Sequence, residues 1–149
     1  MTSGQTRELV VAGVDGSEES IMALSWAARY AKATGAALQA VLAWHYPAAV
    51  GTAPPGVTPQ PVRAQAEQYV LDNLTAAIGK AAEPAAELAE PRIAYGHAAP
   101  VLVDESGQAD LLVVGGRGHS SFAGMLLGSV STYCVSHARC PVLVVRQPR

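Results

Sequence analysis

Five short runs that are typical of strands, four of them largely apolar, alternate with segments whose apolar residues mostly recur at helical spacing. The runs cover residues 8–14, 37–44, 87–95, 109–114 and 141–145. The first run is apolar on both alternating faces, as a strand must be when helices cover it on both sides. Strands that alternate with helices in this way indicate a doubly wound parallel sheet. We therefore predict an α/β, Rossmann-like fold with a five-stranded parallel sheet, helices on both faces and the strand order 3-2-1-4-5.

The segments between the runs carry helix and loop signals. Ser17 offers a capping oxygen to a first helix, and Gly35 is placed to follow its last residue. Further helices are predicted over residues 62–82, 98–106 and 126–138. Pro91 falls inside the third run and predicts an edge strand, because proline cannot donate to the ladder. Residues 45–61 are rich in proline and predict a long surface loop.

Length and composition limit the class of protein. At 149 residues we expect one domain over residues 1–149, and with half the residues apolar and 15% charged we expect it to be ordered. The apolar runs fall short of the roughly 20 residues of a membrane span. A net charge of −2 without clustered Lys and Arg disfavours nucleic acid as a partner. Residues 1–8 lack the apolar core of a secretory signal, so we expect a soluble, cytoplasmic protein with no membrane association. Cys134 and Cys140 are expected to be reduced packing residues.

A glycine-rich run at residues 115–131 follows the apolar run 109–114 and leads into a predicted helix. A strand, a glycine loop and a helix start together form the layout of an anion site, because backbone N–H groups can approach a phosphate there. The run lacks the Gly-Lys-Ser/Thr ending of a Walker loop, and its spacing differs from the dinucleotide fingerprint. The alternative is a flexible connection whose glycines serve turns alone.

The predicted sheet brings a second segment to this loop. Ligands of doubly wound sheets lie outside the carboxyl ends of the strands where the strand order reverses, so the first and fourth strands should flank the crevice. Gly13 and Asp15 would then lie near the loop that begins at Gly115. Asp15 could contact a metal or a ribose, or could start the turn before the first helix. Gly13 weakens a strand unless a ligand or a packed helix approaches its backbone closely.

Three segments resemble the universal stress protein family, in its single-domain, ATP-binding type. They are residues 11–17, 109–115 and 140–145. The family's ATP-binding pattern, G-2x-G-9x-G(S/T), is matched here by Gly115, Gly118, Gly128 and Ser129. The resemblance implies an ATP-binding, usually dimeric, cytoplasmic protein of stress or dormancy physiology that has no generally established reaction.

The resemblance also implies where the nucleotide would bind. The loop 115–121 with the pair 129–130 would wrap the phosphates, residues 13 and 15 would lie near the adenosine portion, and the backbone at 43 or 44 would border the adenine. Relatives often have further glycines where this chain has residues 119–121, whose side chains could donate to phosphate or narrow the loop. The candidate nucleotide-binding residues are Gly13, Asp15, Ala43, Trp44, Gly115, Gly116, Arg117, Gly118, His119, Ser120, Ser121, Gly128, Ser129, Val130 and Ser131.

The residues of this candidate site favour holding a nucleotide over consuming it. Phosphate charge would be met by backbone N–H groups, the helix dipole and the hydroxyls of Ser129 and Ser131, with Arg117 or a Mg²⁺ ion as further candidates. No side chain is spaced as a base for phosphoryl transfer, so we assign no catalytic residue and leave the metal ligands unknown. We predict a nucleotide-dependent regulatory module. A slow Mg-dependent ATPase, and a dimeric interaction protein that binds cyclic AMP or no nucleotide, are the alternatives.

The final apolar strand predicts a partner. An apolar strand at a sheet edge is a liability unless something covers it. Pairing of residues 142–145 with a second copy about a twofold axis would cover this edge. We therefore expect a homodimer through the C-terminal strand.

Overall fold

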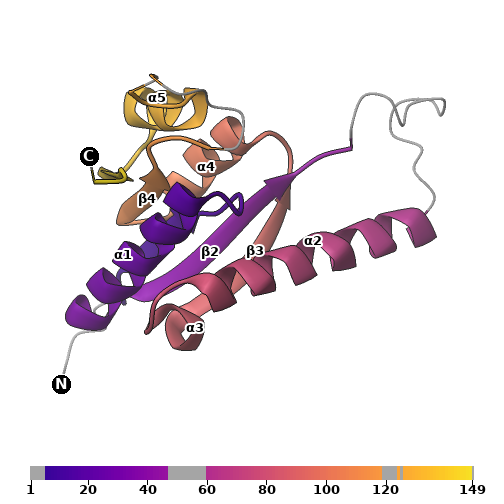
Figure 1. Cartoon of the computed structure of the whole chain (residues 1–149), viewed down its shortest axis with the longest axis horizontal. Coiled ribbons are helices and arrows are strands. Elements are labelled where there is room, and N and C mark those ends of the chain that lie inside the picture. Colours follow the sequence, from indigo (N-terminus) through magenta and orange to yellow (C-terminus); the bar gives the residue numbers. More distant parts are fainter. Residues whose placement is uncertain (1–5, 47–59, 119–123, 125, 149) are drawn as a thin grey trace.

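The computed structural model of the chain describes residues 6–46, 60–118, 124 and 126–148. Its centre is a parallel sheet of five strands in the order β3-β2-β1-β4-β5 (Figure 1). The strands are β1 (Leu9–Gly13), β2 (Ala37–Trp44), β3 (Ala89–Tyr95), β4 (Leu111–Gly115) and β5 (Val142–Val145). The predicted fold class and strand order are confirmed, and the strand that contains Pro91 lies at an edge of the sheet.

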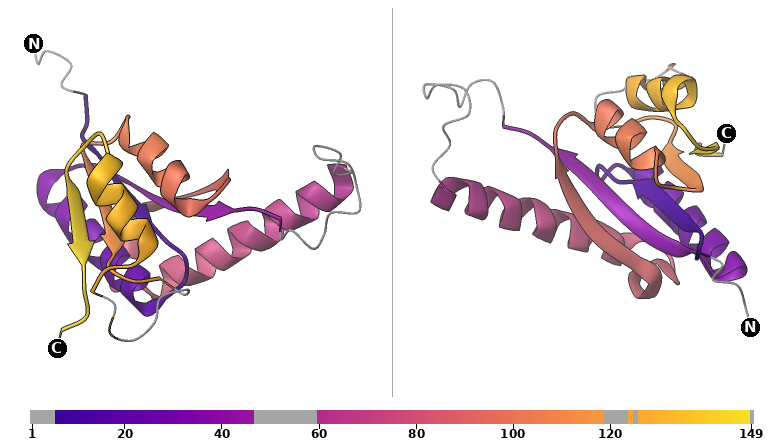
Figure 2. Two further views of the ribbon diagram at one scale, coloured as in Figure 1. Left: turned by 90° about the horizontal axis from the view of Figure 1, so that it is seen from above. Right: turned by 180° about the vertical axis from the view of Figure 1, so that it is seen from behind.

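Helices cover both faces of the sheet. They are α1 (Glu18–Thr34), α2 (Gln60–Lys80), α3 (Ala85–Leu88), α4 (Ala98–Ser106) and α5 (Ser129–His137). Figure 2 shows α1 and α2 on one side of the strands and α4 with α5 on the other. The connection from each strand through a helix to a parallel neighbour is the crossover that the alternating pattern predicted.

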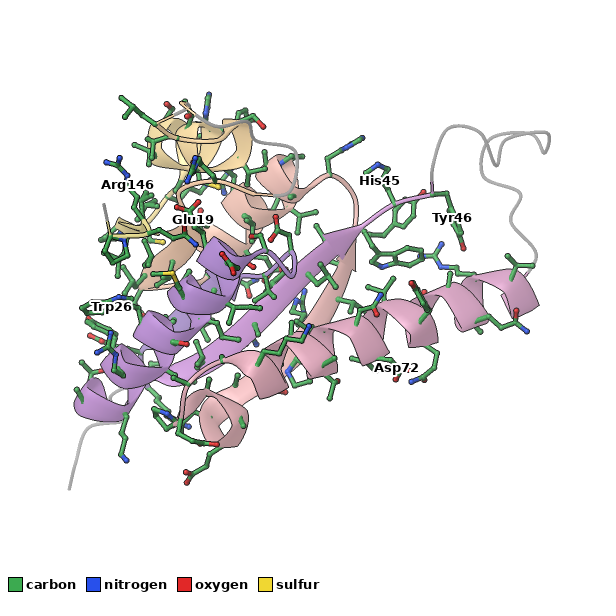
Figure 3. The ribbon with its side chains drawn as sticks, viewed as in Figure 1. Glu19, Trp26, His45, Tyr46, Asp72 and Arg146 are labelled. Carbon is green, nitrogen blue, oxygen red and sulfur yellow. The ribbon has the colours of Figure 1, made fainter. Side chains whose placement is uncertain are left out.

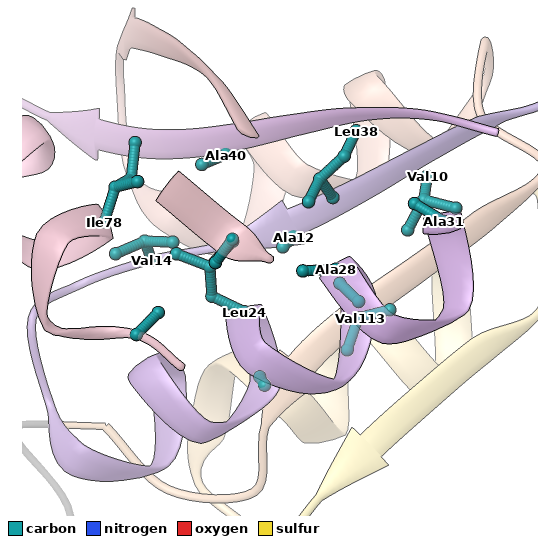
Figure 4. Close-up of a cluster of buried hydrophobic side chains, with 14 of the residues drawn as sticks. Val10, Ala12, Val14, Leu24, Ala28, Ala31, Leu38, Ala40, Ile78 and Val113 are labelled. Carbon is teal, nitrogen blue, oxygen red and sulfur yellow. The ribbon is translucent and has the colours of Figure 1, made fainter. Parts of the chain in front are cut away.

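Each face of the sheet has its own buried cluster. Val10, Ala12 and Leu24 belong to the cluster beneath α1, α2 and α3 (Figure 4). Val11 points the other way and packs with Leu102 and Cys134 beneath α4 and α5. Successive residues of β1 thus serve opposite faces, which explains why this strand is apolar throughout.

The start of α1 is fixed beside the end of β1. The Ser17 side chain accepts a hydrogen bond from the backbone N–H of Ser20 at 3.3 Å, and Gly35 after the last turn has a φ of 77°. Both assignments confirm the predicted helix limits. Glu18 and Glu19 occupy the first turn, where the helix dipole favours negative charge. The end of β1 and the first turn of α1 therefore form one defined corner.

The prediction for the last helix was wrong at its start. We expected the helix from residue 126, whereas α5 begins at Ser129 with Gly128 as its N-cap. The backbone N–H of Gly128 donates to the carbonyl of Gly116, and this tertiary bond sets where the helix can begin. The short helix α3 was not predicted, and it includes residues 87 and 88, which we expected at the start of the third strand. α2 begins at residue 60, so residues 60 and 61 of the predicted loop are helical, and residues 47–59 lie outside the described part.

The cysteines are free, as predicted. Cys134 is fully buried in the cluster beneath α4 and α5, and burial raises the pKa of its thiol to about 11. Within the described ranges, every helix is too short or too polar to cross a membrane.

Candidate functional site

The carboxyl ends of β1 and β4 meet where the strand order reverses. β1 pairs with β2 on one side and with β4 on the other, with Ala12 opposite Val113. Asp15 follows β1 directly, and the glycine loop follows β4. The prediction that the first and fourth strands are neighbours is confirmed, and this edge is the position where doubly wound sheets bind ligands.

A cleft opens at this edge, lined by residues that follow β1 and β4, by the end of β2 and by the first residues of α5. A cleft at this edge of a doubly wound sheet is where a small-molecule ligand is expected. Predicted residues that line it are Gly13, Asp15, Ala43, Gly115, Arg117, Gly118, Gly128, Ser129, Val130 and Ser131. Both chain segments singled out by the sequence, the end of the first strand and the glycine loop, therefore contribute to one cleft.

Other predicted site residues are placed differently. Trp44 does not line the cleft; its ring contacts the rings of Tyr46 and Tyr95, with centroid separations of 5.3 and 5.1 Å. Gly116 is buried behind the cleft lining, where its carbonyl accepts hydrogen bonds from Gly128 and Ser131. Residues His119, Ser120 and Ser121 lie outside the described residues.

Sequence reasoning missed part of the lining. The missed residues are Val14, Ser17, Ser20, Val41, Leu42, Ala98, Leu102 and Val114. Most are apolar, and in the sequence they are indistinguishable from core residues of the same strands and helices. Their positions beside the crevice could be inferred only from the strand order, because the carboxyl end of β2 lies next to that of β1.

The glycine loop runs directly against the start of α1. A Cβ atom added to Gly115 would lie 2.8 Å from the backbone carbon of Glu19 and 2.9 Å from the nitrogen of Ser20. A Cβ on Gly118 would lie 2.5 Å from Oδ2 of Asp15. Glycine at these positions allows the two segments to approach each other.

Gly13 is explained by helix packing. A Cβ on this residue would lie 2.7 Å from Cδ1 of Leu102 in α4, so the helix passes directly over the strand. Of the two interpretations left open by the sequence, the structure supports close approach of a helix. Gly13 also lines the cleft, and its missing side chain leaves space at the base of the opening.

The N-terminus of α5 faces the cleft through residues 128–131. Gly128 has no side chain to cap the helix, and the N–H groups of Ser129, Val130 and Ser131 have no side-chain partner within the described part of the chain. The first N–H groups of a helix have no intrahelical acceptor and carry the positive end of its dipole. This arrangement can bind an anion such as a phosphate.

The Ser131 hydroxyl holds the loop together. It is buried, and its Oγ lies 2.8 Å from the carbonyl oxygen of Gly116 and 3.0 Å from that of Gly128. The hydroxyl proton is therefore directed at carbonyls, which makes Ser131 a support of the loop. Ser129 is exposed and lines the cleft, so its hydroxyl is the better placed of the two to donate to a ligand.

Asp15 starts the turn before α1. Its Oδ1 accepts hydrogen bonds from the backbone N–H of Ser17 at 2.9 Å and from the Ser17 hydroxyl. This is the turn-forming role that the sequence offered as one alternative. The side chain is exposed at the mouth of the cleft beside Gly118, so a contact to a ligand is compatible with that role.

An ion pair links the loop to α1. Nε of Arg117 lies 3.5 Å from Oε2 of Glu19, whose side chain is only 7% exposed. Oε1 of Glu19 accepts a hydrogen bond from the backbone N–H of Gln147, after β5, at 3.2 Å. Figure 3 shows Glu19 in α1, on the side where Arg146 lies. In the sequence Glu19 is only an acidic residue two positions after Ser17, near the start of the first helix, and its partners lie far away along the chain.

Comparison with known proteins assigns nearly the whole chain to one protein family. A model described as the universal stress protein family matches residues 6–146. The chain is 34% identical over 166 aligned positions to a universal stress protein of Mycobacterium tuberculosis, and the alignment covers 100% of this chain and 51% of that protein. The chain thus spans about half the length of the curated relatives it matches.

Solved structures give the same assignment. Universal stress protein UspA from Lactobacillus plantarum superposes with a TM-score of 0.71 at 25% identity, over 95% of this chain and 99% of that one. A universal stress protein in complex with cAMP superposes with a TM-score of 0.56 at 32% identity, over 93% and 95% of the two chains.

Proposed function

The chain belongs to the universal stress protein family, and we propose that it binds ATP in the cleft between β1 and β4 and acts as a nucleotide-dependent regulatory module in a stress or dormancy response. One observation carries the proposal. The glycine loop and the uncapped N-terminus of α5 meet Asp15 in one cleft. The relative in complex with cAMP supports an adenine nucleotide as the class of ligand.

The cleft offers different chemistry on its two sides. On the β2 side it is lined by Val41, Leu42 and Leu102, which suit a purine base. On the β4 side lie Gly118 and the first N–H groups of α5, which suit phosphates. We place the adenine against the end of β2 and the phosphates at the start of α5.

We propose that the residues around the phosphates bind the nucleotide and do not hydrolyse it. Mg²⁺ is usually held by one or two carboxylates together with substrate phosphates and water. Asp15 is the carboxylate of the cleft lining and would be its protein ligand. Within the described ranges there is no group of three His, Cys, Asp or Glu residues that could hold an ion without the nucleotide. We therefore propose that Mg²⁺, where present, enters with the nucleotide. Regulation then depends on whether the cleft holds a nucleotide.

Cyclic AMP is the second candidate ligand. Arg117 is the cation of the described cleft lining, and it is already paired with Glu19. A site with little positive charge to spare suits a ligand with a single negative charge. The solved relative in complex with cAMP favours the same candidate.

We also propose that the protein is a cytoplasmic homodimer of single domains, joined through β5. β5 lies at the edge of the sheet next to β4, and Leu143 within it is 38% exposed. A second copy related by a twofold axis would pair with this strand and cover the leucine. Leu143→Lys should give a monomer in analytical ultracentrifugation, and an unchanged sedimentation coefficient would contradict this interface.

Calorimetric titration with ATP and with cyclic AMP tests the nucleotide site. Gly118→Val places a side chain against Asp15 and should weaken binding by at least about tenfold, or about 1.4 kcal/mol. Gly79→Val is the matched control, because a Cβ at Gly79 in α2 meets nothing within 4 Å. If neither nucleotide binds the unaltered protein, or if Gly118→Val binds as the control does, the proposed site is wrong.

A further inference from the structure

The charge balance of the cleft depends on Arg117. Among the cleft-lining residues that the structure describes, Arg117 is the one cation and Asp15 the one carboxylate. The guanidinium of Arg117 already has an anionic partner, because its Nε lies 3.5 Å from Oε2 of Glu19. A phosphate that approaches Arg117 must therefore share it with a resident carboxylate.

Glu19 is held in place independently of Arg117. Its side chain is 7% exposed, and a carboxylate so far from water requires fixed partners. The backbone N–H of Gln147 donates to its Oε1 at 3.2 Å, and its position in the first turn of α1 places it at the positive end of the helix dipole. When Arg117 turns towards another anion, Glu19 keeps these interactions and stays close to the cleft.

From this arrangement we infer that Glu19 determines the phosphate-charge specificity of the site, because its carboxylate competes with the ligand for Arg117. The inference rests on the proposed nucleotide site. While Glu19 holds Arg117, the ligand receives less attraction from this cation. ATP with the largest negative charge loses most of that attraction, AMP loses less, and cyclic AMP with one negative charge loses least. Glu19 thereby biases the cleft towards adenine nucleotides of low charge.

Glu19→Gln tests the inference by removing the charge while retaining the shape and an oxygen that can accept from Gln147. Glu18→Gln is the matched control. It makes the same change in net charge in the same helical turn, but Glu18 is exposed and its Oε2 bonds the Gln147 side chain at 2.8 Å. Dissociation constants for ATP, AMP and cyclic AMP are measured by calorimetry without divalent ions.

The expected result is a graded change. Glu19→Gln should tighten ATP binding about tenfold, or about 1.4 kcal/mol, because the freed guanidinium of Arg117 can then form a charge-assisted contact with a phosphate. The affinity for cyclic AMP should change by about twofold or less, and the change for AMP should lie between the two. Glu18→Gln should change the affinity for each nucleotide by less than about twofold, because exposed charges are screened.

A double-mutant cycle with Arg117→Gln separates specificity from a structural role. If Glu19 acts through Arg117, Glu19→Gln should have little effect on ATP affinity in the Arg117→Gln background. Equal shifts for all three nucleotides, no shift, or the full gain without Arg117 would overturn the inference. Failure of the unaltered protein to bind any nucleotide would instead refute the proposed function.

A second variant covers the case in which Glu19→Gln does not fold, as judged by circular dichroism. Glu19→Asp keeps the charge but is one methylene shorter, which withdraws the carboxylate from Arg117. Its ratio of ATP to cyclic AMP affinity should rise above that of the unaltered protein. An unchanged ratio would count against Glu19 as the determinant of specificity.

Discussion

Ser131→Ala tests how the glycine loop is held against the start of α5. The hydroxyl of Ser131 bonds the carbonyls of Gly116 and Gly128 from a position that is 2% exposed. Its removal does not orphan either carbonyl, because Gly116 still accepts from the N–H of Gly128 and Gly128 still accepts from that of Thr132. Ser131→Ala should therefore lower the free energy of unfolding by the net value of one buried hydrogen bond, about 1 kcal/mol. This is less than the cost of leaving a buried polar group without a partner, which reaches about 3 kcal/mol.

Thermal and urea unfolding followed by circular dichroism measure this loss. For a domain of this size about 1 kcal/mol corresponds to a fall of roughly 2–4 °C in Tm. Ser136→Ala is the control, because Ser136 is exposed on the same helix and its replacement brings the same gain in helix propensity. The difference between the two variants isolates the hydroxyl. A difference below about 0.3 kcal/mol would refute the role of Ser131, since it would lie within the scatter of surface substitutions.

Three further predictions concern the same corner and the core. Gly115→Ala forces a Cβ to within 2.8 Å of the α1 backbone and should cost about 1–3 kcal/mol of unfolding free energy, whereas an unchanged urea midpoint would show that the loop shifts freely. Gly128→Asp supplies a capping carboxylate to α5, so it should raise Tm slightly. Calorimetry should show ATP affinity falling by tenfold or more, about 1.4 kcal/mol. A change of Tm and affinity in the same direction would contradict the anion site. Cys134 has a folded pKa of about 11, above the thiol value of 9.0, so its contribution to stability is complete below pH 9 and is lost as the pH rises towards 11. Stability measured from pH 8 to pH 11 should therefore fall more steeply for the unaltered protein than for Cys134→Ala, by up to about 2–3 kcal/mol, and equal slopes would refute the burial argument.

Local signals in the sequence were sufficient where structure depends on neighbouring residues. β2 and α4 have the predicted limits, Ala37–Trp44 and Ala98–Ser106, because turn or capping residues flank each element. The start of α5 was misplaced because Leu126 and Leu127 continue an apolar pattern, while a tertiary hydrogen bond to Gly116 decides the limit. Contacts between distant segments leave no such trace in a single sequence.

Glu19 illustrates the same limit within the site. The sequence shows an acidic residue in a first helical turn, and the helix dipole is a sufficient explanation for it. Its burial and its pairing with Arg117 arise only when β4 lies beside β1 and the loop folds over α1. The strand order was predictable, so the neighbourhood could be inferred, but the partner of a particular side chain could not.

The glycines of the family pattern are required for different reasons in this chain, and this affects how their substitutions should be interpreted. Gly115 is required by the backbone of α1, so its variants report mainly on folding. Gly128 has a φ of −76° and a ψ of 171°, which any residue can adopt, so its backbone conformation does not demand glycine. What glycine preserves at that position is a helix start without a capping side chain, and a cap would raise stability. An uncapped start therefore gives up a small amount of stability and leaves N–H groups available to an anion. Opposite changes in stability and affinity at Gly128 are consequently the sharpest means of separating a ligand site from a packing requirement.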